Sequence, residues 1–467
     1  MYYYFYKHIE SNIDICNCLI CVVICFVILL IAFCLFVWFW HKYRVQKFYD
    51  DIDKKILITK SGSLCNGYGK CVVDNKNQVQ ETHWWYNATI YHIVIDSFYG
   101  WKETKVRNKE CPDEFIGGTL KGIKDKLDYI QTLGFNTIML TPVFQSNAYH
   151  GYHTTDYTKI DPHFGTWEDF YELVNAVHEK GMKIICDYVP NHCHKSNILF
   201  ENARTPSSKT HNWFYFDKKK GNNYTPFLHY SELPKFNLYN RDAAEYMISI
   251  AEMMAYSGID GLRIDHVIGL PFSFLENLMS RIKKINPDIF VFGEATATGV
   301  KSTEFDQLYF KTIHIKKLAL KYELSQDNLQ TQYVNLLDGI LDFEFLNIIK
   351  SEVEQGNGIM GNLFLLERLK THFENYSSDF APVLFLDNQD LNRFMFYCNG
   401  DKKLLDEAVM FMCNLPYPIC VFYGTEQYMV NSTDLKEGNY ADLEVRQPMD
   451  WHTVSSVRKI YRRRLNK

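Results

Sequence analysis

The sequence predicts an α/β fold, a (β/α)8 TIM barrel with a small inserted domain after the third strand, preceded by a single transmembrane helix. Three observations predict the barrel. Short apolar or β-branched runs alternate with helical patterns, eight of these runs are typical of strands, and acidic residues follow several of them. The chain has 467 residues, 47% of them hydrophobic, which is enough to bury one large core. We therefore expect one main domain with attachments.

The predicted strands are short and separated by capped helices. Thr166 and Asp169 have capping-box spacing, and Asn240 is placed to begin a later helix. Eight strands can close a barrel with a packed interior, although the same number also fits an open, doubly wound sheet. The strands are predicted at residues 89–95, 136–140, 183–187, 261–265, 289–293, 340–345, 383–386 and 419–423.

Acidic residues at the ends of these strands favour the barrel, because the carboxyl ends of the strands form its catalytic face. Cleavage of a glycosidic bond needs one carboxylate to attack the sugar and another to protonate the leaving oxygen. Asp265 suits the first task, since Arg263 lies on the same strand face and would keep it ionised. Glu294 ends the next strand and suits the second. The acidic residues concerned are Asp96, Asp187, Asp265, Glu294 and Asp390.

Four sequence blocks resemble the α-amylase family, glycoside hydrolase family 13, in the order typical of that family. They lie at residues 187–192 (DYVPNH), 261–266 (GLRIDH), 292–295 (FGEA) and 385–390 (FLDNQD). The resemblance extends from about residue 84 to residue 460. It implies that Asp265 is the nucleophile, Glu294 the acid/base and Asp390 a third carboxylate that stabilises the distorted sugar. Configuration at the anomeric carbon would then be retained.

The same resemblance implies a set of substrate contacts around these carboxylates. Tyr152 would stack beneath the sugar at the cleavage point, and the other expected contacts are His192, Arg263, His266 and Gln389. Gln389 stands where the family usually has a histidine, and a glutamine can donate the same hydrogen bond but cannot carry charge. No organic cofactor is implied. Asn191 is a candidate calcium ligand.

A short segment, residues 233–237 (LPKFN), resembles the corresponding segment of the neopullulanase and cyclodextrin-hydrolase branch. The implied substrate is an α-1,4-linked glucan or maltooligosaccharide, with α-1,6 bonds as a second linkage. The insertion at about residues 191–240 would wall the cleft, or would be a loop that only covers the barrel. The net charge of −5 gives no indication of a nucleic-acid partner.

The N-terminal region predicts a membrane anchor. Residues 19–40 contain no ionisable side chain and would span about 33 Å as a helix. We expect a tail at 1–18, the span at 19–40, a stalk at 41–83 and the catalytic domain at 84–467. Basic residues that follow the span, Lys42, Arg44 and Lys47, favour a cytoplasmic domain. Four glycosylation triplets favour the extracellular or lumenal side, which we expect; they begin at Asn87, Asn223, Asn375 and Asn431.

An alternative function comes from a second resemblance. A single span before an amylase-like domain resembles the heavy chains of heteromeric amino-acid transporters, in which the barrel serves as a scaffold. Cys65 or Cys71 would then form a disulfide with a membrane partner, or the two would close a small loop with each other. The complete carboxylate set favours the enzyme. After the predicted eighth strand, we expect the C-terminal β domain that the resemblance implies to be absent.

Overall fold

The computed structural model describes most of the predicted catalytic domain and part of the N-terminal region. Residues 65–66 and 70–71 are described through their backbone pairing alone. The described residues are 29–40, 42–44, 46–47, 65–66, 70–71, 83–100, 107–216, 223–296, 312, 325–437 and 440–452. The predicted tail, 1–18, and most of the predicted stalk, 41–83, lie outside them.

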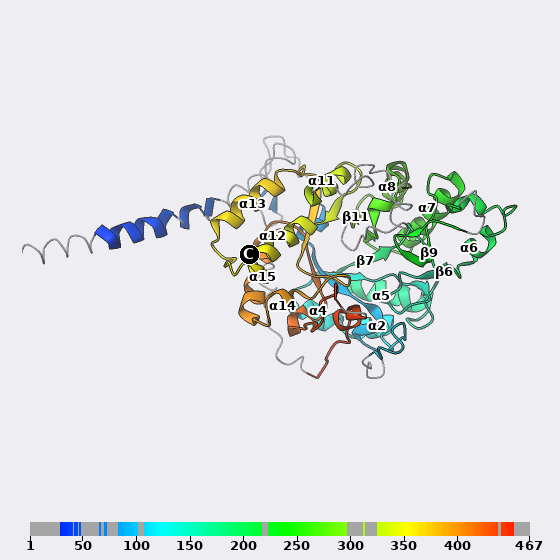
Figure 1. The fold of residues 1–467 in the computed structure, drawn as a ribbon, viewed down its shortest axis with the longest axis horizontal. Helices are drawn as coiled ribbons and strands as arrows, with labels where there is room; N and C mark the ends of the chain where they lie inside the picture. The colour runs from blue at the N-terminus through cyan, green and yellow to red at the C-terminus, as the bar shows by residue number, and fades with distance from the viewer. Residues whose placement is uncertain are drawn as a thin grey trace, which may run out of the picture.

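A closed barrel of eight parallel strands forms the centre of the fold (Figure 1). Each strand pairs with its predecessor and successor along the chain, and β14 pairs with β3 to close the ring. The predicted barrel is confirmed, and the open, doubly wound sheet is excluded. The strands are β3 (Thr89–Ile93), β4 (Thr137–Leu140), β7 (Lys183–Tyr188), β10 (Gly261–Ile264), β11 (Phe290–Gly293), β12 (Gly339–Leu341), β13 (Ala381–Phe385) and β14 (Ile419–Phe422).

Helices cover the outside of the barrel, and their ends follow the cap signals of the sequence. Thr166 and Asp169 form the predicted capping box at the start of α5, and Asn240 accepts a hydrogen bond from the backbone nitrogen of Ala243 at the start of α7. The longer helices are α5 (Trp167–Glu179), α7 (Arg241–Tyr256), α8 (Phe272–Ile285), α12 (Phe343–Glu354), α13 (Leu363–Phe373) and α15 (Lys402–Asn414). The shorter ones are α2 (Ile95–Phe98), α3 (Leu120–Asp125), α4 (Leu127–Leu133), α6 (Ile198–Ala203), α11 (Gln326–Gln330), α14 (Phe394–Tyr397) and α16 (Ala441–Val445).

One strand differs from its prediction. The run at 340–345 is apolar at alternate positions, but only β12 (Gly339–Leu341) is strand, and α12 begins at Phe343. The cause is Asp342, whose carboxylate accepts a hydrogen bond from the backbone nitrogen of Phe345 at 3.0 Å and caps the helix. The aromatic residues that followed the strand pattern therefore lie on the first turn of a helix.

Aromatic packing closes the amino end of the barrel. Trp85, in the short 3-10 helix η1 (Trp84–Asn87), is 2% exposed and stacks on Phe290, the first residue of β11, with ring centroids 5.1 Å apart. The ammonium of Lys283 lies 4.9 Å from the centroid of the Trp85 ring. The opposite end, where the strands terminate, is left for polar side chains.

The segment between β7 and α7 forms the expected insertion. It contains α6, the 3-10 helix η2 (His211–Trp213) and an antiparallel pair, β8 (Pro226–Phe227) and β9 (Tyr230–Pro234). The end of the segment returns to its beginning, because the backbone nitrogen of Phe236 donates to the carbonyl of Asn191 at 3.0 Å. The insertion therefore lies beside the carboxyl end of β7.

The predicted membrane anchor is not supported. Of the predicted span, residues 29–40 form an exposed helix that projects from the barrel (Figure 1), and residues 19–28 lie outside the described residues. Within the described ranges no helix is long and apolar enough to cross a membrane. The prediction of a single-pass membrane protein with an extracellular or lumenal catalytic domain is therefore wrong.

Two further predictions depend on the membrane-anchored arrangement, namely the glycosylation sites and the disulfide with a membrane partner. Asn431, in one of the glycosylation triplets, is 1% exposed, and its side chain donates to the Asn392 oxygen at 2.9 Å, so this site is closed to modification in the fold. Cys65 in β1 (Cys65–Asn66) lies opposite Cys71 in β2 (Lys70–Cys71), and their side chains lie outside the description. Nothing in the described residues supports a disulfide-linked membrane partner.

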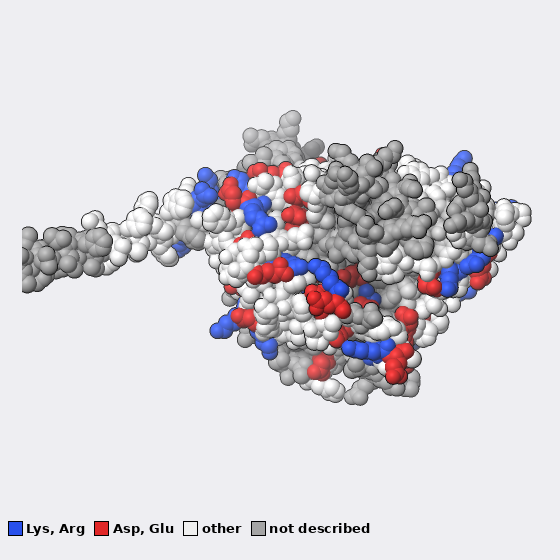
Figure 2. Space-filling model, viewed as in Figure 1, with Lys and Arg blue, Asp and Glu red and all other residues white. Residues whose placement is uncertain are grey.

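Acidic and basic side chains are interleaved over the described surface in Figure 2. Several form exposed ion pairs, including Lys124 with Glu172 at 2.7 Å and Arg281 with Glu245 at 2.6 Å. Exposed pairs of this kind contribute roughly 0–1 kcal/mol each. These pairs explain why charges of both signs lie side by side on the surface, but they add little to the stability of the fold.

Candidate active site

The register of neighbouring strands brings the predicted residues together. Arg263 on β10 lies opposite Asp187 on β7 and opposite Phe292 on β11. Backbone hydrogen bonds continue past the ends of the strands, from Asp265 N to the Tyr188 carbonyl at 2.9 Å and from Glu294 N to the Ile264 carbonyl at 3.0 Å. Parallel strands in this register place the side chains of three consecutive strand ends over the same end of the barrel.

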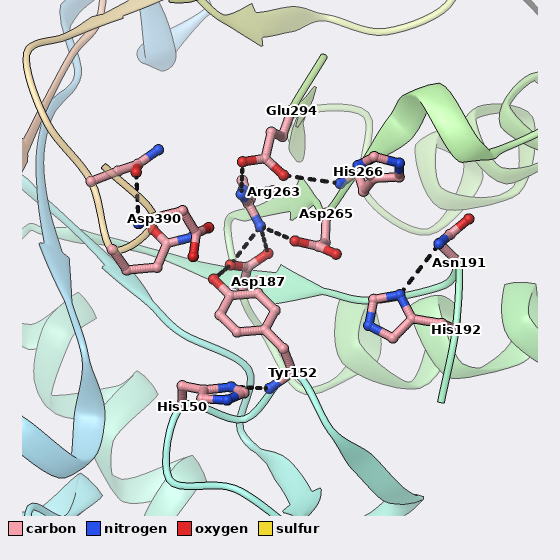
Figure 3. A network of polar contacts seen from close by, with 12 residues as sticks. His150, Tyr152, Asp187, Asn191, His192, Arg263, Asp265, His266, Glu294 and Asp390 are labelled. Atoms are coloured by element: carbon pink, nitrogen blue, oxygen red, sulfur yellow. Dashed lines mark hydrogen bonds and ion pairs between the residues drawn. The ribbon is translucent and has the colours of Figure 1, made fainter. Parts of the chain in front are cut away.

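Arg263 is the centre of this cluster (Figure 3). Its Nη1 donates to both oxygens of Asp187, at 2.7 and 2.8 Å, and to Oδ1 of Asp265 at 2.8 Å. Its Nη2 forms an ion pair with Oε1 of Glu294 at 2.9 Å. The Arg263 side chain is 1% exposed. Its ion pairs with these carboxylates offset the free-energy cost of burying its charge.

The second oxygen of Glu294 is held by the backbone. Oε2 accepts a hydrogen bond from the backbone nitrogen of His266 at 3.2 Å. His266 has φ 46° and ψ 54°, a left-handed conformation that costs energy for a residue with a Cβ atom. The strained residue next to Asp265 therefore directs its N–H at Glu294.

Burial raises the pKa of all three carboxyl groups around Arg263. The pKa rises to about 6 for Asp187 and to about 7 for both Asp265 and Glu294, against the lowering effect of Arg263. Each carboxylate also raises the pKa of its neighbours by repulsion. The groups titrate as a set near neutral pH, the range that a proton donor requires. This differs from the expectation that Arg263 keeps Asp265 ionised, because the effect of burial on the pKa of Asp265 outweighs that of the guanidinium.

Tyr152 approaches the cluster from the loop between β5 (Phe144–Ser146) and β6 (Thr154–Ile160). Its hydroxyl donates to Oδ2 of Asp187 at 2.6 Å, and its backbone nitrogen donates to Nδ1 of His150 at 3.2 Å. Figure 3 shows its ring beside Asp187 and below Arg263. The structure thus brings Tyr152 next to the predicted catalytic pair.

Asp390 faces the cluster from another side, on the segment after β13. Its Oδ2 accepts from Nε2 of Gln389 at 2.5 Å, and its Oδ1 accepts from Nη2 of Arg446 at 2.8 Å. The Asp390 side chain is 46% exposed, compared with 9% for Asp265 and 8% for Glu294. The third carboxylate therefore lies at the open side of the site.

His192 and Asn191 lie farther from the cluster, at the end of β7 (Figure 3). The His192 ring stacks on Phe227 with centroids 4.4 Å apart, and Phe227 also contacts the His266 ring edge-on at 4.7 Å. Burial lowers the pKa of His192 to about 3 and that of His266 well below its ordinary value. Both imidazoles are therefore neutral and suited to hydrogen bonds with hydroxyl groups.

The expected calcium site at Asn191 gains no support. Asn191 is fully buried, and its Nδ2 lies 3.3 Å from Nδ1 of His192. Among the described residues, no group of three or more His, Cys, Asp or Glu side chains is arranged to hold a metal ion. A calcium ion requires six to eight oxygen ligands. No chemical step is assigned to a metal.

Sequence reasoning missed the residues that support Asp390. Arg446 follows α16 and lies far from Asp390 along the chain, in a segment without regular periodicity. Tyr149 contacts the side chain of Arg446, and Arg107 donates a hydrogen bond to its backbone carbonyl. The one available signal is the four-residue spacing of Asp442 and Arg446, whose side chains are 3.3 Å apart.

Comparison with known proteins identifies the family. The family model described as "Alpha amylase, catalytic domain" matches residues 92–459. The chain belongs to the α-amylase family. This match agrees with the resemblance found in the four sequence blocks.

Similar curated proteins of the α-amylase family include several bacterial hydrolases. The chain is 34% identical to "Alpha-amylase 2" of Dictyoglomus thermophilum, over 79% of this chain and 60% of that protein. It is 28% identical to "Neopullulanase 2" of Thermoactinomyces vulgaris, over 81% and 61% of the two chains. It is 27% identical to "Intracellular maltogenic amylase" of Bacillus subtilis, over 73% and 56%. The chain thus spans about 60% of the length of these relatives.

Solved structures share the α-amylase fold. The α-amylase from Geobacillus thermoleovorans, complexed with acarbose, superposes with a TM-score of 0.63 at 24% identity, over 82% of this chain and 78% of that one. The type III pullulan hydrolase from Thermococcus kodakarensis gives a TM-score of 0.64 at 23% identity, over 82% and 69%. At these identities the likeness shows the fold alone.

Proposed function

We propose that the chain is a retaining α-glycosidase that hydrolyses α-1,4-glucosidic bonds in maltooligosaccharides or α-glucans, with α-1,6 bonds as a second linkage. The observation that carries the proposal is the buried Arg263, which binds Asp265 through Nη1 and Glu294 through Nη2. Two carboxylates anchored to one guanidinium provide a nucleophile and a proton donor close together. This arrangement suits a mechanism with a covalent intermediate.

In the first step, Asp265 attacks the anomeric carbon. Its Oδ1 is held by Arg263, so we assign the attack to Oδ2. The bond between the anomeric carbon and the glycosidic oxygen breaks, and Glu294 transfers its proton to that oxygen. A glycosyl ester on Asp265 results, and the leaving sugar departs as an alcohol.

In the second step, Glu294, now ionised, takes a proton from a water molecule. The water oxygen attacks the anomeric carbon and displaces Oδ2 of Asp265. Both steps invert the configuration, so the product has the configuration of the substrate. The raised pKa of Glu294 supports this double role, since the group can both give and take a proton near neutral pH.

We assign the surrounding residues to contacts with the sugar. Asp390, half exposed at the open side, is assigned to hydroxyl groups of the distorted ring in the transition state. Tyr152 is assigned to the ring face, and the neutral His192 and His266 to sugar hydroxyls. Gln389 holds Asp390 and can also donate to the substrate.

The substrate class is supported by relatives and by one motif. The relatives bear the names α-amylase, maltogenic amylase and neopullulanase. Lys235, in the LPKFN segment, is 1% exposed and donates to the carbonyl of Gly269 at 2.7 Å. This bond fixes the insertion against the loop that follows Asp265 and His266.

The test compares the purified chain with its Asp265→Asn variant on maltooligosaccharides, cyclodextrin and pullulan. We expect wild-type hydrolysis of at least one substrate and a loss of activity of about 100-fold or more in the variant, which lacks the nucleophile. Proton NMR of the first product should show the α-anomer. Equal rates for the two proteins would exclude the proposed function, and a β-anomer would exclude the assigned roles.

A further inference from the structure

Arg446 binds the carboxylate of Asp390, the most exposed of the predicted catalytic carboxylates, and holds it in place. Asp390 is 46% exposed and would otherwise sample several rotamers in water. Its two oxygens are bound from different directions, Oδ2 by Gln389 at 2.5 Å and Oδ1 by Arg446 at 2.8 Å. Only the second of these bonds comes from a charged donor, so only Arg446 adds the attraction between opposite charges.

The guanidinium of Arg446 is itself fixed. The side chain is 10% exposed, and its Nε donates to the carbonyl of Gln389 at 2.7 Å. Its Nη1 lies 3.3 Å from the hydroxyl of Tyr149 and 3.3 Å from Oδ2 of Asp442. One side chain therefore binds both the backbone of Gln389 and the carboxylate of Asp390, which sets their relative orientation.

The backbone of Arg446 is anchored from α2 and from the segment that follows it. Its carbonyl accepts hydrogen bonds from Oγ of Ser97 at 2.8 Å and from Nη1 of Arg107 at 3.0 Å. Arg107 also forms a buried ion pair with Asp96 at 2.5 Å, and its guanidinium lies 3.3 Å from the centroid of the Tyr149 ring. This chain of contacts connects α2, the helix that follows β3, to Asp390.

We propose that Arg446 is a positioning residue that supplies the fixed positive charge beside the third carboxylate, a charge that the neutral amide of Gln389 cannot carry. The inference rests on the proposed function, in which Asp390 binds the distorted sugar. Arg446 keeps the Asp390 carboxylate oriented before the substrate arrives. Its effect therefore belongs to the transition state more than to ground-state binding.

The primary experiment measures kcat and KM for Arg446→Gln and Arg446→Lys on the substrate that the wild type hydrolyses. We expect kcat to fall about 100-fold in Arg446→Gln, as a small displacement of a catalytic group can cause, with little change in KM. Arg446→Lys should recover part of kcat, because it restores the charge without the paired geometry. Arg281→Gln is the matched control: this arginine binds Glu245 and Glu252 on the outer helices, and its loss should leave kcat unchanged.

A second variant separates charge from structural support. Gln389→His in the Arg446→Gln background provides a new cation beside Asp390 at low pH. We expect kcat of this double variant to exceed that of Arg446→Gln below about pH 6.5, the ordinary histidine pKa, and to converge with it above that pH. A purely structural role for Arg446 would give no such pH-dependent recovery.

The outcomes distinguish the inference from the proposed function. Wild-type activity no higher than that of Asp265→Asn would exclude the proposed function itself. An active wild type with unchanged kcat in Arg446→Gln would exclude the role of Arg446. Equal losses in Arg446→Gln and Arg446→Lys, without pH-dependent recovery in the double variant, would also exclude it and leave Arg446 as a structural tie of the α16 segment.

Discussion

At the scale of single residues, Arg263 determines how the site carries its charge. Three buried carboxylates share one guanidinium, so full ionisation of the set would leave net negative charge in a desolvated place. The raised pKa values of Asp187, Asp265 and Glu294 reflect the free-energy cost of ionising all three carboxyl groups in this buried site. Near neutral pH the cluster retains a proton that can be transferred, which the proposed mechanism assigns to Glu294.

The first prediction concerns the pH dependence of this proton. Burial raises the pKa of Glu294 to about 7, so the acid form is present below that pH and is lost as pH rises through it. We expect kcat/KM to decline on the alkaline side of about pH 7. It should also decline on the acid side, where Asp265 becomes protonated, and a bell-shaped profile results.

Glu294→Gln provides the control for that profile. This variant cannot donate a proton, and we expect its activity on maltooligosaccharides to fall about 1000-fold, within the usual range for a general acid. Aryl glycosides whose leaving group needs no protonation should lose much less in the first step. A wild-type alkaline limb that persists in Glu294→Gln would assign that limb to another residue.

The sequence predicted the residues of the strand ends better than their supports. Asp265 and Glu294 follow adjacent strands within recognisable blocks, so their proximity follows from a parallel barrel. Arg446 meets Asp390 through a loop that has no periodic pattern, and only the folded chain brings the two together. The neutral Gln389 was visible in the sequence, whereas the nearby cation was not.

At the scale of secondary-structure elements, β12 is the shortest strand of the barrel. It contains Gly339–Leu341 and pairs with β11 and β13. A Cβ atom on Gly339 would lie 2.3 Å from the carbonyl oxygen of Ala381, which belongs to the neighbouring backbone. Such an oxygen cannot move without breaking the ladder between β12 and β13.

The second prediction follows from this contact. We expect Gly339→Ala to lower the free energy of unfolding by about 2 kcal/mol or more, as overpacking in a core does, when measured by urea denaturation. Gly358→Ala is the matched control, since a Cβ atom there meets nothing within 4 Å. Equal stabilities for the two variants would show that β12 can shift to make room.

Element boundaries were predicted where a local signal governs them. The capping box at Thr166 fixed the start of α5, and Asn240 fixed the start of α7. The start of α12 was missed because the aromatic alternation around Asp342 outweighed the capping residue in the prediction. The membrane span predicted at 19–40 gains no support, because no helix among the described residues is long and apolar enough to cross a membrane.

At the scale of the whole molecule, a buried ionic network supports the barrel away from the site. His372 on α13 is 1% exposed and contacts Asp327 on α11 at 2.5 Å and Asp342, the cap of α12, at 2.8 Å. Burial lowers the pKa of His372, but the two carboxylates outweigh that effect and raise it from 6.5 to about 10. The histidine is therefore charged and ties three helices together.

The third prediction concerns stability as a function of pH. Because the pKa of folded His372 exceeds its unfolded value of 6.5, its stabilising contribution is complete below about pH 6.5 and is lost as pH rises toward 10. We expect His372→Gln to cost about 3 kcal/mol at pH 6, since it leaves a buried carboxylate without its cation. The difference from wild type should shrink steadily by pH 10.

Urea denaturation of both proteins at pH 6, 8 and 10 measures this difference. Taking the difference between the two proteins removes titrations that they share, such as that of Lys235, whose pKa burial lowers to about 7. A constant difference over this range would mean that His372 is neutral in the folded protein. Activity per folded molecule should be unaffected, because the network lies outside the proposed site.

The three carboxylates on one guanidinium also have a consequence for inhibitor selectivity. A neutral sugar gains no net Coulomb attraction from this arrangement, but a protonated amine at the position of the anomeric carbon would meet an excess of negative charge. The attraction grows as the carboxylates ionise and ends when the amine loses its own proton. The pocket is thus electrostatically matched to cationic sugar mimics, and it favours them over uncharged analogues of the same shape.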